Sequence, residues 1–490
     1  MSWLDRAIGW VSPEAEARRT RARVVTDRLR AVNGYDGAGK GRRNKWTRGR
    51  DSSANAESRA ALPLLRARHR EMVRNNPYAA SALRVLTTNI VGTGIRPRAM
   101  VEDADQKKSL QQLMLSWAET TAVDYDGRLD LYGLQAQAVR TAMEGGDALI
   151  VRVTERDPAL PIPLKVRLLE GDYLDHTKNG PMENGYAVQG VQFNNEHKRV
   201  GYWLHRTHPG DVLGGFSASK LTPAEDVIHL YEMLRPGQVR GVPRGTAALM
   251  RMKSLDDYQD ARIEAAKSAA CLVGVVVEPE GDVDKAGSVL PEKLEPGMFP
   301  RLKTGEDVRF NNPPSVTGHG EFVSTEQHAI AISYGVPFEA LTGDLSQVNY
   351  SSARMGFMEF GRNVEQYRWS TLIPIVCQGL AGWFNETASL AGKLPGPVRW
   401  EWSPPRREMI DPSREVPPMV DLVRAGGSTL SEWIRTMGHE PDDVFAELAE
   451  ERKRLDNDGL ILTTDAGKVS SAGVTNARAP GQQFPAPGND

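Results

Sequence analysis

One segment of the chain has the residue types of a phosphate-binding loop. Gly34, Gly39 and Lys40 match the pattern G-x-x-x-x-G-K, in which backbone N–H groups and a lysine hold nucleotide phosphates. A serine or threonine should follow the lysine to bind Mg²⁺, but Gly41 occupies that position. The segment also lies between two Arg-rich stretches, rather than between a buried strand and a helix. The pattern therefore does not favour an ATP site.

Metal ligands and catalytic side chains are equally poorly supported. His197, His205 and His208 lie close together in sequence, but no H-E-x-x-H motif accompanies them, which favours scattered strand and turn residues over a metal site. The carboxylates within 256–264 recur at helical spacing and are interpreted as a solvated helix face rather than a cation site. No G-x-S-x-G elbow is present. We therefore expect no catalytic residue, no metal and no cofactor.

Composition places the chain among ordinary globular proteins. Of its 490 residues, 40% are hydrophobic and 25% are charged, which is enough apolar material for more than one core. The two cysteines, Cys271 and Cys377, exclude a disulfide framework and a Cys-rich metal site. The longest apolar stretch, 269–277, is too short to cross a bilayer, and Asp5 interrupts what a signal peptide would keep apolar. We expect neither a signal peptide nor a membrane-spanning segment.

Charge is distributed very unevenly. The formal net charge is −2, but residues 1–98 hold 21 Lys and Arg against 8 Asp and Glu, so that this part carries +13 and the remainder −15. Such a split indicates that the N-terminal part meets something acidic. The acidic remainder of its own chain or of a neighbouring copy is favoured over direct nucleic-acid binding, because no DNA-reading motif accompanies the charge.

Hydrophobic periodicity predicts an α+β protein. Short apolar runs of strand type fall between 147 and 233, separated by Gly, Pro and Asn. A Pro-rich strand-and-turn insertion is expected at 278–316. Helical spacing predicts the following helices: 1–30, two within 60–90 with a break near Pro77, 107–122, 131–145, 244–272, 324–334, a long stretch 351–390 interrupted at Pro374, and 413–425, 429–437 and 441–455. Thr429 and Glu432 have the spacing of a capping box.

Two stretches resemble a known family. The first is RARHREMVRNNPYAASALRVLTTNIVGTGIRPR (66–98), and the second is ISYGVPFEALTGDLSQVNYSSARMGFMEFGRNVEQYRW (332–369). Together they closely resemble the lambda-type portal proteins of tailed bacteriophages. The segment Tyr350–Arg354, after a Gly-Val-Pro turn and L-T-G-D, is the most specific element, followed by Arg74–Ala79 leading to Asn89–Ile95. The resemblance covers roughly residues 20–455.

The resemblance implies a ring of copies, usually twelve, at one capsid vertex, through which double-stranded DNA is packaged and ejected. It implies a portal fold with a wing, a two-helix stem, a β-containing clip and a helical crown. Mapped onto this chain, the regions are the following: 1–59 a basic N-terminal arm, 60–243 the wing, 244–272 a stem helix, 273–322 the clip, 323–340 the second stem helix, 341–352 the tunnel loop, 353–412 the long wing helix and a strand, 413–455 the crown helices, and 456–490 a flexible tail.

Three sets of residues become candidates on this mapping. The tunnel loop contains no Lys or Arg, which suits a channel that lets DNA slide, because each basic contact with a phosphate would add affinity. Its DNA-facing candidates are Gln347, Asn349, Tyr350, Ser351 and Ser352. The candidates for reversible contact between the clip and partner proteins are Glu292, Lys293, Glu295, Arg301, Lys303 and Glu306, although solvation of a rigid turn explains this mixed-charge set equally well. The candidates for clamping a neighbouring subunit are Arg42, Arg43, Lys45 and Arg48.

The expected partners follow from the same resemblance. They are other copies of the chain, the passing DNA, the terminase large subunit, a head–tail adaptor, and the major capsid and scaffolding proteins, with no membrane. The expected location is the capsid portal vertex of the virion, after assembly in the host cytoplasm. Two alternatives stay open: a DNA-packaging ATPase or phosphate-binding enzyme using Gly34–Lys40, and another ring protein of the head–tail junction.

Overall fold

The computed structural model describes residues 52–462, apart from gaps at 212–217, 272–275, 278–300, 303–317, 347, 407–408, 410 and 440. The chain divides into two units, Met1–Ser53 and Ala54–Asp490, and the elements below belong to the second. Its α-helices are α3 (Ala54–Asn75), α4 (Pro77–Ile90), α5 (Ala104–Ala118), α6 (Leu131–Gly145), α7 (Leu249–Cys271), α8 (His319–Tyr334), α9 (Phe338–Thr342), α10 (Tyr350–Tyr367), α11 (Gln378–Leu390), α12 (Pro412–Arg424), α13 (Leu430–Thr436) and α14 (Pro441–Asn457). Within the described ranges, no helix combines the length and the apolar composition that crossing a bilayer requires.

The strands form small, mostly antiparallel sheets. They are β1 (Arg96–Met100), β2 (Ala148–Val153), β3 (Lys165–Glu170), β4 (Gly180–Met182), β5 (Gly185–Val188), β6 (Val191–Phe193), β7 (Arg199–Leu204), β8 (Lys220–Pro223), β9 (Val227–Leu230), β10 (Val276–Val277), β11 (Arg301–Leu302) and β12 (Arg399–Ser403). Strands β4 to β8 follow one another in a five-stranded meander, and β2 lies between β3 and β9. The predicted α+β character is confirmed.

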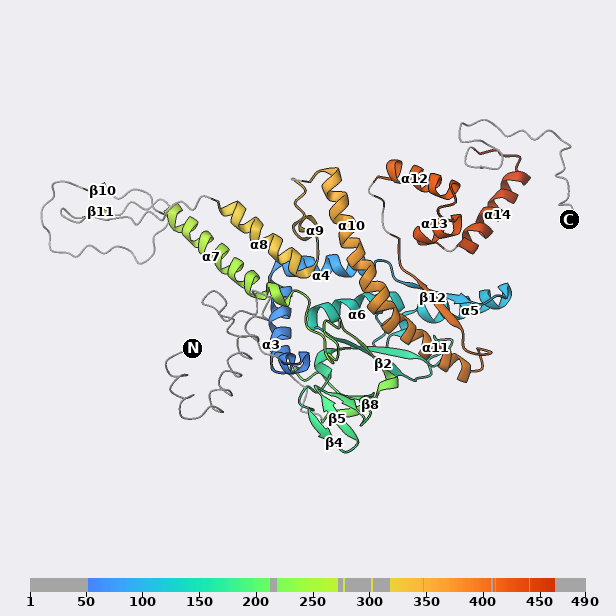
Figure 1. The fold of residues 1–490 in the computed structure, drawn as a ribbon, viewed down its shortest axis with the longest axis horizontal. Helices are drawn as coiled ribbons and strands as arrows, with labels where there is room; N and C mark the ends of the chain where they lie inside the picture. The colour runs from blue at the N-terminus through green and yellow to red at the C-terminus, as the bar shows by residue number, and fades with distance from the viewer. Residues whose placement is uncertain are drawn as a thin grey trace, which may run out of the picture. The chain divides into compact units, whose positions relative to one another are not determined.

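Strand β2 separates two hydrophobic cores. Because side chains alternate along a strand, Ile150 points into the large helical core, whereas Leu149 points into a smaller core shared with Tyr202 and Leu204 of β7. Helices α3, α4 and α6 pack together within the large core (Figure 1). The five-stranded sheet is thereby fixed to the helical body through the three-stranded one.

Helix α4 begins at a well-defined cap. The Asn76 side chain accepts hydrogen bonds from the backbone N–H groups of Tyr78 and Ala79, and Pro77 occupies the first helical turn, where a missing N–H costs nothing. The predicted break near Pro77 is therefore confirmed. One face of α4 is buried, at helical spacing, through Ala79, Ala82, Leu83, Leu86 and Ile90.

The predicted long helix is one helical stretch with a π-helical middle. Helices α10 and α11 are joined by the π segment η6 (Arg368–Cys377), which contains Pro374. Proline has no N–H and cannot donate the i→i−4 hydrogen bond of an α-helix. In the wider π-helical turn, hydrogen bonds run from i to i−5, so the α-helical bond that Pro374 lacks is not part of the pattern. The sequence therefore predicted the position of the interruption correctly.

Helices α7 and α8 run side by side away from the helical body (Figure 1). An ion pair between Arg251 and Glu326 (2.8 Å) and a hydrogen bond between the Tyr258 hydroxyl and His319 Nδ1 (3.0 Å) join them. Between the two helices the described residues include the paired strands β10 and β11; the rest of the predicted insertion at 278–316 lies outside the described residues. Helix α8 begins five residues earlier than predicted, because Gly318 adopts a left-handed conformation and opens it.

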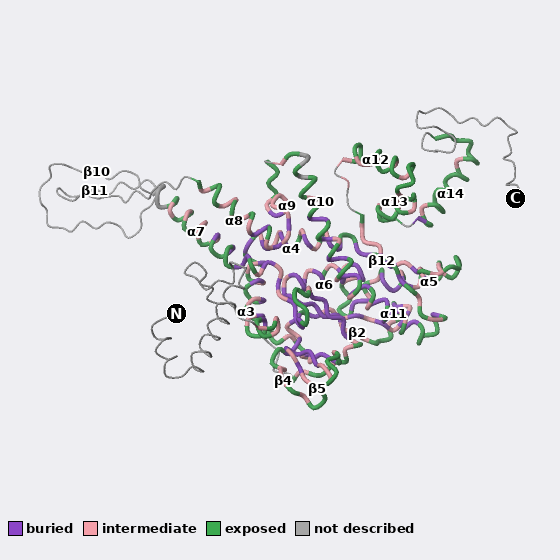
Figure 2. Tube along the Cα trace, in the orientation of Figure 1, coloured by how far each residue is buried: buried purple, intermediate pink, exposed green. Residues whose placement is uncertain are grey.

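Most side chains of the three C-terminal helices are exposed, and most of the others are half-buried (Figure 2). Helices α12, α13 and α14 agree with the predicted ranges to within two residues. The predicted Thr429 cap is confirmed, since its hydroxyl accepts the Glu432 N–H at 3.0 Å. In these helices only Pro441 is buried among the described residues.

Candidate functional site: the loop between α9 and α10 and the helices that hold it

The loop between α9 and α10 is held by local hydrogen bonds. Gly343 ends α9 in a left-handed conformation (φ +75°), and its N–H donates to the Glu339 carbonyl at 2.8 Å. Asp344 then accepts the Ser346 N–H at 2.9 Å, and this hydrogen bond lowers the pKa of Asp344. These bonds fix the start of the loop, although the side chains of 344–346 are exposed.

Helix α10 begins with a reciprocal cap. The Asn349 side chain accepts the Ser352 N–H at 2.9 Å, and the Ser352 hydroxyl lies 3.3 Å from the Asn349 N–H that donates to it. Both side chains are exposed, but each already serves the helix end. The cap therefore competes with any outward contact these two residues make.

The predicted tunnel-loop residues belong to different parts of the structure, and one of them is not described. Gln347 lies outside the described residues. Tyr350 and Ser351 form the first turn of α10, whereas Asn349 and Ser352 are its cap. No Lys or Arg occurs between Leu341 and Ala353. A direct role of these five residues toward DNA stays a prediction.

Helix α8, which leads to the loop, is anchored to the helical body by Tyr334. The His69 imidazole donates from Nδ1 to the Glu144 carbonyl at 2.8 Å, so its Nε2 accepts the Tyr334 hydroxyl at 2.8 Å. Burial lowers the pKa of His69, which keeps the ring neutral and the acceptor available. A Cβ on Gly245 would come within 2.3 Å of the Tyr334 ring, so only glycine allows this approach. Helices α3, α6 and α8 are thereby fixed to one another.

The RNNPYA motif joins α4 to both α7 and α8. The Asn76 amide, whose oxygen caps α4, donates from Nδ2 to Asp256 of α7 at 2.9 Å. Gln327 of α8 donates to the Tyr78 hydroxyl at 2.7 Å. The sequence singled out this motif by resemblance only; its role as the common anchor of the helix pair comes from the structure. Asp256 is thus half-buried and bonded, and the prediction of a purely solvated acidic face is wrong at this residue.

A buried charge cluster holds the base of the same region. The Asp147 carboxylate accepts hydrogen bonds from Arg66 (3.1 Å), Arg240 (2.8 Å) and His229 (3.1 Å), and from the Gly241 N–H (2.6 Å). Burial alone would raise the pKa of Asp147, but Arg240, His229 and Arg66 reverse this and hold the pKa well below its usual range. Because burial lowers the pKa of His229, this imidazole donates as a neutral ring. The cluster has the geometry of a structural junction, fully enclosed and without access to a substrate.

The structure separates the three histidines considered as metal ligands. His197 bonds to the Tyr186 hydroxyl (3.0 Å), whereas His205 lies 3.9 Å from Asp175 and His208 lies 3.4 Å from Glu170. Among the described residues one group, Glu170, Asp172 and His208, has the spacing of metal ligands. Arg70 donates to both of its carboxylates at 2.6 Å, so a guanidinium already supplies the positive charge.

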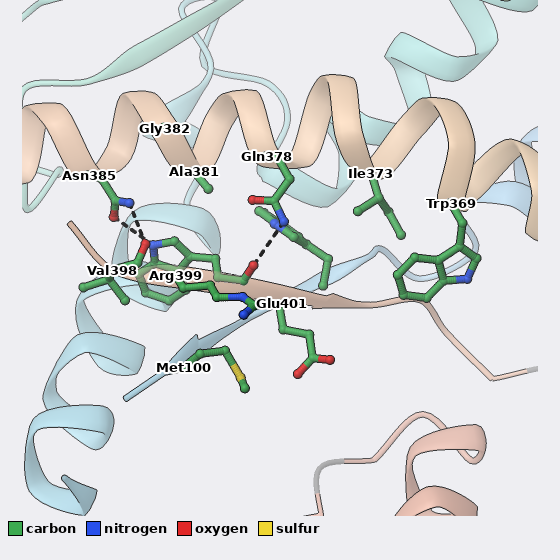
Figure 3. A pocket seen from close by; sticks show the side chains of 12 residues that line it. Met100, Trp369, Ile373, Gln378, Ala381, Gly382, Asn385, Val398, Arg399 and Glu401 are labelled. Carbon is green, nitrogen blue, oxygen red and sulfur yellow. Dashed lines mark hydrogen bonds between the residues drawn. The ribbon is translucent and has the colours of Figure 1, made fainter. Parts of the chain in front are cut away.

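The two-stranded ribbon of β1 and β12 lies over the long helix and borders a groove of about 500 Å³ (Figure 3). Gln378 donates to the Trp400 carbonyl of β12 at 3.1 Å, and Asn385 donates to the carbonyl of Val398, just before the strand, at 2.7 Å, so that amides of α11 bond to this side of the ribbon. On the other side, the Gln111 amide donates to Pro97 and accepts from Ala99 of β1. Side-chain amides thus bond to both outer edges of the ribbon.

The remaining predicted site residues lie almost wholly outside the described residues. These are the clip candidates Glu292, Lys293, Glu295, Lys303 and Glu306, the arm candidates Arg42, Arg43, Lys45 and Arg48, and the phosphate-loop segment 34–41. Arg301 opens β11, and its side chain is not described.

Comparison with known proteins identifies the family. A family model described as "Phage portal protein, lambda family" matches residues 40–368. The chain is 28% identical to the probable portal protein of Halomonas phage phiHAP-1, with 88% of each chain covered. It is 24% identical to the portal protein of Escherichia phage N15 (91% of this chain, 95% of the relative) and 22% identical to portal protein B of Escherichia phage lambda (91% and 94%).

Solved structures of lower similarity include two from the necks of gene transfer agent particles. One, titled as the neck of an empty particle with C6 symmetry, has 16% identity and a TM-score of 0.43, and covers 78% of this chain and 94% of the other. The second, titled as the neck of a native particle with C12 symmetry, has 17% identity and a TM-score of 0.41, with coverage of 76% and 93%. The family assignment rests on the sequence match, which spans the RNNPYA motif, the charge cluster and the α9–α10 loop: the chain belongs to the lambda family of phage portal proteins.

Proposed function

We propose that this portal protein forms a ring, usually of twelve copies, at one vertex of a phage-type capsid, and that double-stranded DNA passes through its axis during packaging and ejection. The observation that carries the proposal is the family match over residues 40–368. The curated relatives are named as portal proteins and not as enzymes. Mapped on the described elements, α7 and α8 are the stem, α10 to α11 the long wing helix, and α12 to α14 the crown.

The α9–α10 loop suits the lining of such a channel. Every basic side chain that contacts a phosphate releases counterions and adds affinity, so a lining rich in Lys and Arg would hold DNA in place. This loop offers one carboxylate, Asp344, and no basic residue between Leu341 and Ala353. The Gly343 turn and the Asn349 cap hold the two ends of the loop in place, which would keep a weakly adhesive surface at one position in each copy.

The charge asymmetry supports ring closure by the N-terminal arm. A closed ring needs two different, complementary surfaces on each subunit. We propose that the basic residues of the arm, including Arg42, Arg43, Lys45 and Arg48, meet the acidic remainder of the neighbouring copy. Oppositely charged surfaces also steer subunits together during assembly.

The clip region between α7 and α8 is the proposed docking site for changing partners. The terminase large subunit would bind there during packaging and a head–tail adaptor afterwards, and mixed charges suit such exchange. Major capsid and scaffolding proteins would contact the outer surface during assembly in the host cytoplasm. The finished location would be the virion.

Electron microscopy of the purified chain tests the proposal directly. Negative-stain images should show rings with an axial hole wide enough for a DNA duplex. A chain that stays monomeric under all assembly conditions contradicts the proposal. Nucleotide binding separates the enzyme alternative: micromolar or tighter ATP affinity that is lost in Lys40→Ala would instead favour a phosphate-handling enzyme.

A further inference from the structure

A methionine-rich groove lies between the long helix and the C-terminal helices. It has a volume of about 610 Å³, and its walls come from α10, the end of β12, α12 and α13. Its apolar lining includes Phe357, Met358, Met409, Met419 and Met437. Flexible thioether side chains adapt to the shape of an incoming apolar surface, and grooves of this kind are suited to an amphipathic helix. We call this site the Met-rich groove.

The lining of the Met-rich groove carries a small excess of positive charge, with five arginines against four glutamates. Glu365 and Glu401 are paired with arginines, whereas Glu415 and Glu432 have no basic partner within 4 Å among the described residues. Arg354, Arg406 and Arg435 likewise have no carboxylate partner within 4 Å in the described part of the chain. Other arginines of the chain, such as Arg70 and Arg152, are engaged in ion pairs. Unpaired guanidinium groups beside an apolar groove favour a ligand that combines apolar and acidic side chains.

Helix α14 has the complementary surface. Phe445 and Leu448 lie three residues apart on one face and are 41% and 52% exposed, and we call this face the α14 stripe. Three carboxylates of the same helix, Asp443, Glu447 and Glu451, have no cationic partner within 4 Å among the described residues. A 17-residue helix with a single buried residue gains little from packing within its own copy.

The α14 stripe does not fill the groove of its own copy. Helix α14 starts at Pro441, and the next residue, Asp442, is bonded to Lys107 of α5 at 2.7 Å and lies 3.5 Å from Arg98 of β1. The start of the helix is thereby fixed, and the stripe that follows stays exposed while the groove stays open. Each copy thus has one unfilled groove and one uncovered helix.

We propose that α14 of one copy lies in the Met-rich groove of a neighbouring copy, with its carboxylates against the arginines of the rim. The proposal rests on the ring of the proposed function, because a closed ring needs a pair of different, complementary surfaces on every subunit. Burying Phe445 and Leu448 against methionines removes apolar surface from water in both copies. The C-terminal helices would then be stabilised mainly by neighbouring subunits.

Disulfide cross-linking of the full chain tests this contact. In a Cys271→Ser background, the pair Met358→Cys and Leu448→Cys should form covalent dimers and higher ladders on oxidation, visible on non-reducing gels. The native Cys377 will not interfere, because burial raises the pKa of its thiol and keeps it unreactive. The matched control replaces Leu448→Cys by Glu450→Cys, which faces away from the stripe on the same helix, and should give at least tenfold less cross-linked product.

The outcomes separate this inference from the proposed function. Rings with intermolecular ladders for the 448 pair support the contact. Rings that give no ladder, equal ladders for both cysteine pairs, or an intramolecular cross-link overturn the proposed contact. These results do not contradict the proposed channel function. If the unsubstituted chain forms no ring at all, the result contradicts the proposed function itself, on which this contact rests. As a second measure, Leu448→Asp should lower the fraction of chain in rings at least tenfold on sedimentation, and an unchanged fraction also overturns the contact.

Discussion

At the scale of single residues, Asp147 shows how one carboxylate organises several distant segments. Its partners, Arg66 and Arg240, lie 81 and 93 residues away in sequence, and both are almost fully buried. Removing the Asp147 carboxylate would leave Arg240 charged and without a counterion in a medium that solvates it poorly, whereas Arg66 would keep Asp172. The packing of α3, β9 and the segment around Arg240 against one another therefore depends strongly on this one side chain.

The first prediction concerns this carboxylate. Asp147→Asn should lower the free energy of unfolding by about 3–5 kcal/mol, because the buried Arg240 guanidinium loses its counterion while Arg66 keeps only Asp172, at 3.3 Å. Chemical denaturation followed by tryptophan fluorescence measures the change. The control is Glu196→Gln, which removes an exposed pair with Lys198 and should shift the stability by less than about 1 kcal/mol. Equal effects of the two substitutions would contradict the assigned role.

The second prediction concerns pH. Burial lowers the pKa of both His69 and His229 below the ordinary value of 6.5, so the unfolded chain binds protons more readily than the folded one. Their contribution to stability is complete above pH 6.5 and is lost as the pH falls below it. The denaturation midpoint should therefore decrease between pH 7.5 and 5.5, and His69→Gln should reduce that decrease. A midpoint that is constant over this range would refute the neutral-imidazole geometry.

At the scale of elements, the Asn76 cap is the joint between α4 and the helix pair α7 and α8. Its side chain serves two purposes, since the oxygen caps α4 and the nitrogen bonds Asp256. Asn76→Ser should keep most of the cap and lose the second bond, whereas Asn76→Ala loses both. We expect the alanine variant to be about 1 kcal/mol less stable than the serine variant. Hydrogen exchange along α7 should rise in both variants; protection that is unchanged in both would show that Asn76 does not hold α7.

A second element-scale prediction concerns the turn into β1. Gly94 has a φ of +109°, and a Cβ there would lie 2.5 Å from the Tyr132 ring, whereas Gly127 (φ +69°) faces open space. Gly94→Ala should therefore cost roughly 2–5 kcal/mol, from backbone strain and overlap together. Gly127→Ala carries the strain alone, at about 1–2 kcal/mol. Thermal denaturation compares the two, and similar losses would mean that the overlap with Tyr132 relaxes freely.

Local sequence patterns predicted the elements well and their junctions poorly. The Pro77 break, the Pro374 interruption and the Thr429 cap depend on residues close in sequence, so their spacing was sufficient. The Asn76–Asp256 and Tyr78–Gln327 contacts span 180 and 249 residues, and no periodicity encodes such distances. The signal available for them was the resemblance of the RNNPYA motif, which marked the segment without explaining it. For the α9–α10 loop, the sequence itself shows that basic residues are absent. It did not predict that Asn349 and Ser352 cap a helix.

At the scale of the whole molecule, the charge asymmetry leads to a prediction on assembly. Deleting residues 1–50 removes 13 Lys and Arg and 5 Asp and Glu, so that the remaining chain is strongly acidic. If the arm closes the ring, the truncated chain should remain monomeric in sedimentation and microscopy. Assembly of the full chain should also weaken as salt is raised, because screening reduces attraction between exposed charges. Intact rings of the truncated chain would count against the arm.

The amide-bonded ribbon has a consequence for how this chain survives at high local concentration. A two-stranded ribbon normally offers unpaired backbone groups on both sides, and such groups recruit strands from other molecules into aggregates. Here Gln111 bonds along one side, and Gln378 and Asn385 bond along the other. These bonds occupy part of each outer edge, so we expect β1 and β12 to recruit strands from other copies less readily than a bare ribbon would.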